Sequence, residues 1–227
     1  MARPKTDDPV ARARILAAAE ALFAEHGFAG VGVRQIAASA GVNGAMIHYY
    51  FGNKENLYVA VIENAASTVR GLIAEATASA QTLEERLTRF VKAYAGYLFG
   101  HPNLARILAR EMIAGGKHVF DILPKYIPTN YAMLRGAMTE AVRSGELREI
   151  DIDLAPISLM GMIVVFQLIR PLIMHGLGNV KFDERFIERL AAHTVDLFLN
   201  GAAKRGQHGA SGRDKRTTAA RRAKVKR

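Results

Sequence analysis

Cysteine is missing from all 227 positions of this chain. Disulfide bonds, thiolate redox sensing and cysteine-ligated zinc are therefore excluded. Long apolar runs are missing too, since no uninterrupted stretch approaches the ~18 residues that indicate a membrane span. The N-terminal Met1–Pro9 lacks the apolar core of a secretory signal. We therefore expect a cytoplasmic protein without a membrane span.

Positive charge is concentrated at the C-terminal end. The formal net charge is +10, and residues 202–227 hold ten Lys and Arg residues against one acid, Asp214. The rest of the chain is thus nearly neutral, so the pI near 10.0 does not indicate a basic surface on the folded part. The tail has almost no large apolar side chain and is not expected to fold alone.

Three uses of this basic tail, residues 202–227, remain open. Its cations favour non-specific binding to DNA, in which each phosphate contact adds salt sensitivity. They would also favour an anionic membrane surface. The third alternative is a solubilising segment without a binding role.

The segment Val33–Lys54 has the pattern of two short helices joined by a tight turn. Ala37 is small where the helices would touch, Gly41 follows four residues later, and Ile47 provides an apolar anchor six residues further on. Glycine suits the turn because a residue without Cβ adopts positive φ without strain. Asn43 suits the N-cap of the second helix. In such a helix-turn-helix, the second helix lies in a DNA major groove.

Five short motifs surround and include this segment: Ile15–Phe23 (ILAAAEALF), His26–Phe28 (HGF), Val33–Ala37 (VRQIA), Ala40–Asn43 (AGVN) and Tyr49–Tyr58 (YYFGNKENLY). With these motifs, residues 10–62 resemble the DNA-binding domain of the TetR/AcrR family of bacterial transcriptional regulators. The chain departs from the family at Gly32, where Ser or Thr is usual, and at Asn43–Met46, where Ser-Lys-Gly-Thr is frequent. The resemblance implies the fold, while the identity of the base-reading side chains stays open.

The second helix of this motif has an inward and an outward face. Ile47, Tyr50 and Phe51 stand at i, i+3 and i+4, so we expect them to face inward. The outward face begins with Gly44 and Ala45. Both are small, so the helix can approach DNA closely, and an alanine methyl can touch a thymine methyl.

Nine residues in and around the motif form the predicted DNA contact: Arg34, Gln35, Asn43, Gly44, Ala45, His48, Tyr49, Tyr50 and Lys54. The first two open the preceding helix, where side chains commonly meet the DNA backbone. His48 and Tyr49 can hydrogen-bond phosphates. The resemblance implies backbone contacts at Asn43, Tyr49, Tyr50 and Lys54. The alternatives are that Tyr50 belongs only to the core and that His48 is only solvated surface.

The remaining chain shows no alternating strand pattern and no internal repeat, so we predict an all-α fold. Caps and breakers predict helices from Pro9 to Gly27, Lys54–Thr77, Thr82–Phe99, Pro102–Ala114, Lys117–Arg143 with interruptions at Pro124 and Pro128, Asp153–His175 with a bend near its end at Pro171, and Asp183–Leu199. The predicted domains are a helix-turn-helix head (1–53), a helical regulatory and dimerisation body (54–201) and a disordered basic tail (202–227).

The segment Asp153–His175 is apolar on nearly every side. Such a helix has to be buried on every side, with one face against the body and the other against a second subunit. In the TetR/AcrR family the last two large helices of each subunit form a four-helix dimer interface. We therefore predict a homodimer, whose two heads could meet two half-sites about one DNA turn apart.

Polar residues within apolar helices predict a small-molecule pocket in the body, since ligand sites are mostly apolar with a few placed polar groups. Gln167 and Arg170 stand at i and i+3, and Met160 and Met174 share their face. The resemblance adds residues from the helices that line the family's pocket: Tyr94, Arg110, Glu111, Met112, His118, Phe120, Tyr126 and Tyr131. The alternative for the arginines is an internal salt bridge, with Arg170 or Arg110 paired to Glu111.

Catalytic and metal chemistry find little support in this sequence. The seven histidines are scattered, with no pair at helical spacing, and no nucleophile-base motif or glycine-rich phosphate loop occurs. We therefore expect no enzyme, metal or cofactor. The favoured function is a sequence-specific transcriptional regulator, a repressor that an apolar or amphipathic effector releases from a palindromic operator. The competing class is an architectural DNA-binding protein that relies on its basic tail.

Overall fold

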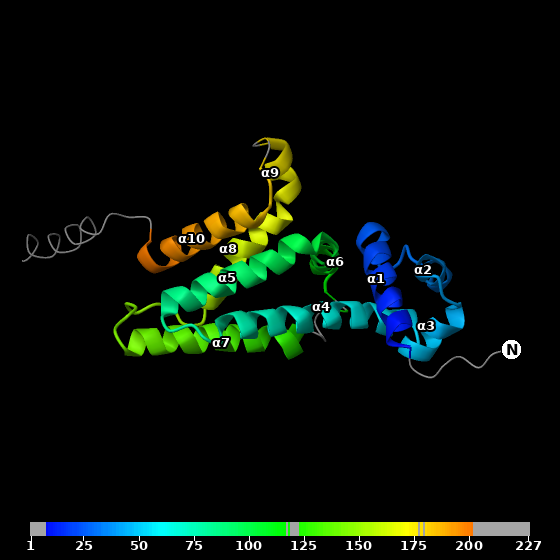
Figure 1. The fold of residues 1–227 in the computed structure, drawn as a ribbon, viewed down its shortest axis with the longest axis horizontal. Helices are drawn as coiled ribbons and strands as arrows, with labels where there is room; N and C mark the ends of the chain where they lie inside the picture. The colour runs from blue at the N-terminus through cyan, green and yellow to red at the C-terminus, as the bar shows by residue number, and fades with distance from the viewer. Residues whose placement is uncertain (1–7, 117, 119–122, 177, 179, 202–227) are drawn as a thin grey trace, which may run out of the picture.

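The computed structural model describes residues 8–116, 118, 123–176, 178 and 180–201. Within these ranges the fold is all-helical, as predicted. The helices are α1 (Pro9–His26), α2 (Val33–Ala40), α3 (Gly44–Phe51), α4 (Lys54–Thr77), α5 (Leu83–Gly100), α6 (Pro102–Ile113), α7 (Leu123–Arg143), α8 (Ala155–Leu168), α9 (Arg170–Gly176) and α10 (Glu184–Asn200). Figure 1 shows α1–α3 as a head at one end and the later helices as an elongated body.

The head is a three-helix unit closed by the start of α4. Asp8 caps α1, where its Oδ1 accepts hydrogen bonds from the N–H groups of Val10 and Ala11 at 3.0 and 3.2 Å. Gly27 ends the helix with φ of 73°. Both ends were predicted from the sequence. The head core contains the fully buried Phe23 and Ile36.

Helix α4 runs from the head through the body and has side chains in both cores (Figure 1). Leu57 and Val61 pack in the core of the head, whereas Val69 and Ile73 pack in the core of the body. By length and composition alone, α4 is apolar enough to cross a membrane. Its packing in two cores gives a sufficient reason for that composition.

The body packs α5 against α4, α10 and α8, and α7 lies alongside α4. Its core includes the fully buried Phe90 and Leu134. Thr82 caps α5 by accepting a hydrogen bond from the Glu85 N–H at 3.1 Å. Glu85 Oε2 accepts in turn from the Gln81 N–H at 2.9 Å, so the predicted capping box closes one residue earlier than its usual form.

Two predicted helices differ from those observed, and proline is involved in both. The bend predicted near Pro171 is present, but it divides the segment Asp153–His175 into two helices, since α8 and α9 meet at 56° around Ile169. Pro171 disfavours helical geometry at the residue before it and offers no N–H to the carbonyl of Gln167. Conversely, α7 continues through Pro124 and Pro128, which we expected to interrupt it. Pro124 lies within the first turn, where N–H groups have no intrahelical partner, whereas Pro128 is the sixth residue and leaves only the carbonyl of Pro124 without its donor.

Candidate nucleic-acid interface and effector site

Helices α2 and α3 form the predicted helix-turn-helix. Gly41 takes φ of 62° in the left-handed region at the end of α2. The turn closes as the Gly41 N–H donates to Ala38 O and the Val42 N–H donates to Ala37 O, at 3.2 and 3.0 Å. Ala37 and Ile47 are buried where the two helices pack. Asn43 then caps α3 by accepting from the Ala45 N–H at 3.0 Å.

Most of the predicted contact residues lie on exposed parts of this motif. Arg34 and Gln35 are exposed in the first turn of α2, and Asn43 is exposed at the cap of α3. On α3, Ala45, His48 and Tyr49 are exposed, whereas Gly44 is half-buried. Tyr49 leaves 63% of its surface accessible, which makes it the most prominent large side chain of this helix.

His48 is oriented by its own helix end. Its Nδ1 lies 2.9 Å from the carbonyl oxygen of Gly52, so Nδ1 carries the proton and donates. In the neutral ring Nε2 is then an acceptor, directed away from that bond. His48 could therefore accept a hydrogen bond from a base amino group, or donate to phosphate when protonated.

Tyr50 and Lys54 have partners inside the protein. The Tyr50 hydroxyl accepts from the Asp8 N–H at 2.8 Å and donates to Asp8 O at 3.2 Å, so this half-buried side chain ties α3 to the start of α1. The Lys54 ammonium donates to Phe28 O and Val31 O, both at 3.0 Å, and lies 4.3 Å from the centre of the Phe28 ring. Two of its three donors are thus committed to the head itself.

Charge on the described head is balanced. Residues 8–53 contain three arginines and three acids. Arg14 donates weakly to Gly41 O at 3.5 Å, and Arg12 lies over the Phe51 ring. Because few cations surround the exposed face of α3, phosphate attraction from the head alone is modest.

The head and the body meet at a buried polar cluster around Glu111 of α6. This side chain is only 6% exposed. Its Oε1 accepts from the Tyr58 hydroxyl at 2.9 Å and from His118 Nδ1 at 3.2 Å, while Oε2 accepts from the His118 backbone N–H. Burial, together with the hydrogen bond and charge of Glu111, raises the pKa of Tyr58. The Phe28 ring covers His118 at 4.7 Å.

Helix α6 also packs directly against the head. Ile107 is fully buried within the head core, although its helix follows the first body helix. Arg110 donates to Glu25 O at the end of α1, at 2.9 Å. The alternative of an internal salt bridge from Arg110 or Arg170 to Glu111 is not found among the described residues, because both arginines donate to backbone carbonyls and Glu111 is bonded to Tyr58 and His118.

Nine of the twelve predicted effector residues have described side chains, and the structure does not gather these nine into one pocket. Arg110, Glu111 and His118 lie at the head–body junction. Gln167, Arg170 and Met174 line a groove between α6 and the α8–α9 bend. Phe120 and the side chains of Met112 and Tyr126 lie outside the described residues.

The three other predicted effector residues neither line the groove nor join the hydrogen bonds of the junction. Tyr94 packs on Phe90, and burial raises its pKa to about 12. Met160 packs against the body core. Tyr131 donates to Asp153 at the surface.

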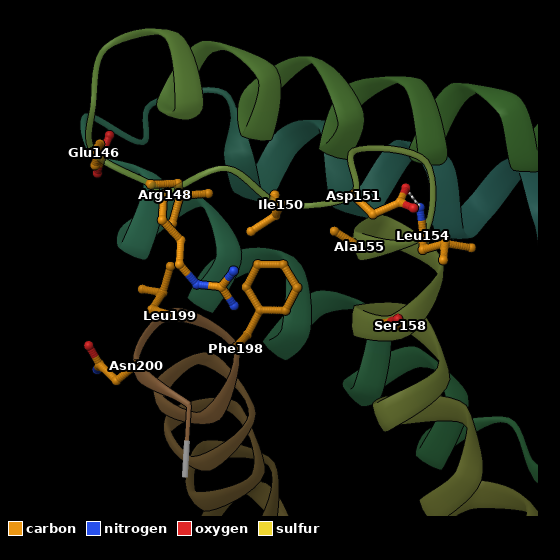
Figure 2. A pocket seen from close by; sticks show the side chains of 11 residues that line it. Glu146, Arg148, Ile150, Asp151, Leu154, Ala155, Ser158, Phe198, Leu199 and Asn200 are labelled. Atoms are coloured by element: carbon orange, nitrogen blue, oxygen red, sulfur yellow. Dashed lines mark hydrogen bonds between the residues drawn. The ribbon is translucent and has the colours of Figure 1, made fainter. Parts of the chain in front are cut away.

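A second hollow, of about 500 Å³, lies at the end of the body far from the head, between the α7–α8 loop and the end of α10 (Figure 2). Asp151 lines it, but its Oδ1 already accepts from the N–H groups of Asp153 and Leu154, both at 3.0 Å. Neither the sequence patterns nor the resemblance pointed to this hollow.

One face of α8 and α9 is apolar and exposed. Seven of the eleven exposed large hydrophobic side chains in the described part of the chain fall within residues 154–174. Leu154, Ile157, Val165, Leu168 and Leu172 follow one another at near-helical spacing, from 44% to 69% exposed. An apolar stripe of this length on a single subunit is typical of an interaction surface.

Two family models match this chain, one at the head and one in the body. Residues 15–61 match the model described as "Bacterial regulatory proteins, tetR family". Residues 83–202 match the model described as the C-terminal domain of the HTH-type transcriptional dual regulator CecR. The first match covers the helix-turn-helix, and the second covers the body from α5 onward.

Individual relatives are HTH-type transcriptional regulators as well. The chain is 35% identical over 107 residues to the HTH-type transcriptional repressor NicS of Pseudomonas putida, which is 47% of this chain and 50% of NicS. It is 31% identical over 150 residues to the HTH-type transcriptional repressor SCO4008 of Streptomyces coelicolor, 66% of this chain and 72% of the relative. The chain thus spans half the length of the first relative.

A solved structure with the same fold is the transcriptional regulator FadR from Bacillus subtilis, crystallised in complex with stearoyl-CoA. The TM-score is 0.69 at 24% sequence identity, and the match covers 85% of this chain and 100% of the FadR chain. The similarity therefore extends over head and body together.

Proposed function

Because this chain belongs to the TetR family of bacterial regulatory proteins, we propose that it is a homodimeric, cytoplasmic repressor that a small molecule releases from a palindromic operator. Members of this family are DNA-binding transcriptional regulators, not enzymes, and this chain has their helix-turn-helix. Repression is supported by the two relatives, both described as repressors. The exposed face of α3 is the observation that carries the proposal.

In this proposal α3 enters the major groove. Ala45 and Tyr49 meet base edges and phosphates, and His48 offers its free Nε2. Arg34 and Gln35 contact the adjacent backbone from the start of α2. Tyr50 and Lys54 act mainly by holding α3 and α4 in place, since their polar groups are bonded within the head.

The exposed stripe of α8 supports the dimer. Two subunits that packed this stripe against each other would bury Val165 and its neighbours around Gly161, where an added Cβ meets nothing within 4 Å. A Val165→Glu variant should therefore sediment as a monomer, because it places a charge in an apolar interface. Leu72→Glu is the matched control, with 42% exposure on α4 against 44% for Val165.

Release by an effector is a shift between two arrangements of the heads. A ligand that prefers the DNA-incompetent arrangement ~100-fold shifts the equilibrium by ~2.7 kcal/mol. The stearoyl-CoA bound by the similar FadR structure supports an amphipathic ligand. The groove beside α6 is a place for it in this chain.

The test is retention of genomic DNA fragments at near-physiological salt by the full-length protein and by a version ending at Gly201. A regulator retains the same few palindromic fragments in both versions, and Tyr49→Ala loses them while Leu72→Ala keeps them. Retention without sequence preference that disappears with residues 202–227 would instead identify an architectural protein acting through its tail.

A further inference from the structure

A groove of about 390 Å³ separates α6 from the α8–α9 bend. Its α6 wall consists of Pro102, Ala105, Arg106 and Ala109, which stand at i, i+3, i+4 and i+7 and thus form one helical face. Leu168 and Met174 add apolar surface from the opposite wall. This size and this apolar lining are typical of small-molecule sites.

The groove contains an uncommitted polar group. Gln167 is only 7% exposed, and its Oε1 is buried without a hydrogen-bond partner among the described residues. A buried amide in this state lowers stability, because its lost hydration is not replaced. The amide group of Gln167 can turn so that either its oxygen or its nitrogen faces the groove. This rotation breaks no hydrogen bond to Oε1, because Oε1 has none. A ligand that bonded to Gln167 would remove this deficit.

The charged groups of the groove are cationic. Arg106 is exposed and has no ion-pair partner within the described part of the chain. Arg170 donates through Nη1 to Phe99 O at 3.0 Å and lies 4.9 Å from the centre of the Phe182 ring, which fixes the guanidinium at the groove. His175 completes the basic edge, and no Asp or Glu belongs to the lining. Such a wall favours an anion.

We propose that this groove binds a small organic acid with an apolar body, and that this ligand is the effector of the proposed repressor. The acid group pairs with Arg106 and Arg170, the apolar body lies on Ala105, Leu168 and Met174, and a polar substituent reaches the amide of Gln167. The effector role of this ligand rests on the proposed function, whereas binding of the acid to the groove does not.

Helix α6 connects this groove to the head. The groove uses its 102–105–106–109 face, while Ile107, Arg110 and Glu111 on other faces contact the head core, Glu25 O and Tyr58. A ligand that displaces α6 outward from α8 therefore acts directly on the packing of α1 and α4. No separate linker has to move for the heads to respond.

The experiment is isothermal titration of the full-length protein, without DNA, with octanoate and phenylacetate. Their neutral counterparts 1-octanol and 2-phenylethanol test the need for the acid group. We expect saturable binding of at least one acid and binding of its alcohol weaker by about tenfold or more, as one charge-assisted contact implies. Arg106→Gln should lower the affinity for the acid by a similar factor, whereas Arg148→Gln, an exposed arginine at the far end of the body, should not.

Gln167→Met adds a readout that needs no ligand. This change removes the unpartnered amide and keeps the side-chain length, so the melting temperature should rise. The affinity for octanoate and phenylacetate should change little, because neither acid has a polar substituent to reach Gln167. The site is refuted if neither acid binds or if acid affinity is unchanged in Arg106→Gln, and an unchanged melting temperature in Gln167→Met would refute the unpartnered amide. An acid that binds through Arg106 but leaves operator binding intact would refute the effector role in the proposed function and leave the site standing.

Discussion

Replacing Lys54 with methionine separates two roles that this residue could have. The sequence pattern predicts a phosphate contact, whereas in the structure its ammonium donates to Phe28 O and Val31 O at 3.0 Å. These bonds fasten the loop between α1 and α2 to the first turn of α4. Methionine keeps most of the side chain and removes the charge and all three donors.

The expected loss can be worked from these contacts. A hydrogen bond to a charged group contributes about 1.5–3 kcal/mol, and the half-buried position of Lys54 favours the lower end of that range. The two hydrogen bonds then contribute about 3 kcal/mol to the free energy of unfolding. The contact of the ammonium with the Phe28 ring adds little, because the site is partly exposed. For a protein of this size, about 3 kcal/mol lowers the melting temperature by roughly 6–12 °C.

The assay is urea unfolding and thermal melting of Lys54→Met beside Lys92→Met. Lys92 forms a surface pair with Glu188 at 3.2 Å, with side chains 44% and 59% exposed, so its loss should change stability by less than about 1 kcal/mol. The salt dependence of operator binding is measured in the same variants. Equal melting temperatures, with a salt slope reduced by about one in Lys54→Met alone, would show a phosphate contact and refute the structural role.

Three further predictions concern the head–body junction. Burial raises the pKa of Glu20, against the opposing charge of His101. Glu20 therefore destabilises the fold at neutral pH, where its buried carboxyl is charged, and this penalty falls as the pH drops through the raised folded pKa. Glu20→Gln should stabilise at pH 7 in urea unfolding, and the gain should shrink as the pH falls towards the unfolded value and be largely gone below pH ~4.3. Tyr58→Phe takes one donor from the buried Glu111 and should cost about 1–3 kcal/mol by the same measurement at pH 7. Ile107→Ala should cost about 2–5 kcal/mol, and hydrogen exchange should show faster opening in α1 as well as α6.

Much of the fold could be predicted because its signals are local. Asp8, Asn43, Thr82 and Asp183 all cap helices, as their positions in the sequence indicate. Gly41 adopts the left-handed conformation expected at the turn. Each of these features depends on a few neighbouring residues, so the sequence contains the necessary information. The bend before Pro171 was located less well, because proline shows that a helix is disturbed but not where the chain turns.

The candidate site could be predicted only where it is a helix face. The exposure of Ala45, His48 and Tyr49 follows from their spacing against the buried Ile47. The partners of Lys54 do not, because Phe28 O and Val31 O are backbone atoms whose position depends on the path of a loop. For the same reason the body residues were assigned to one pocket, although six of them divide between the junction and the groove.

Helix α6 explains why that division was hidden in the sequence. The composition of this helix alone does not show which of its faces meets which partner. In the structure Ile107 completes the core of the head, while Arg106, the preceding residue, lines the groove on the body side. Adjacent residues on a helix point about 100° apart, so one short helix can belong to both parts. A boundary at residue 53 therefore divides the chain in sequence, whereas the packing joins the two parts through α4 and α6. Because α6 lies in both environments, any molecule that changes its position against α8 must also change the packing of the head.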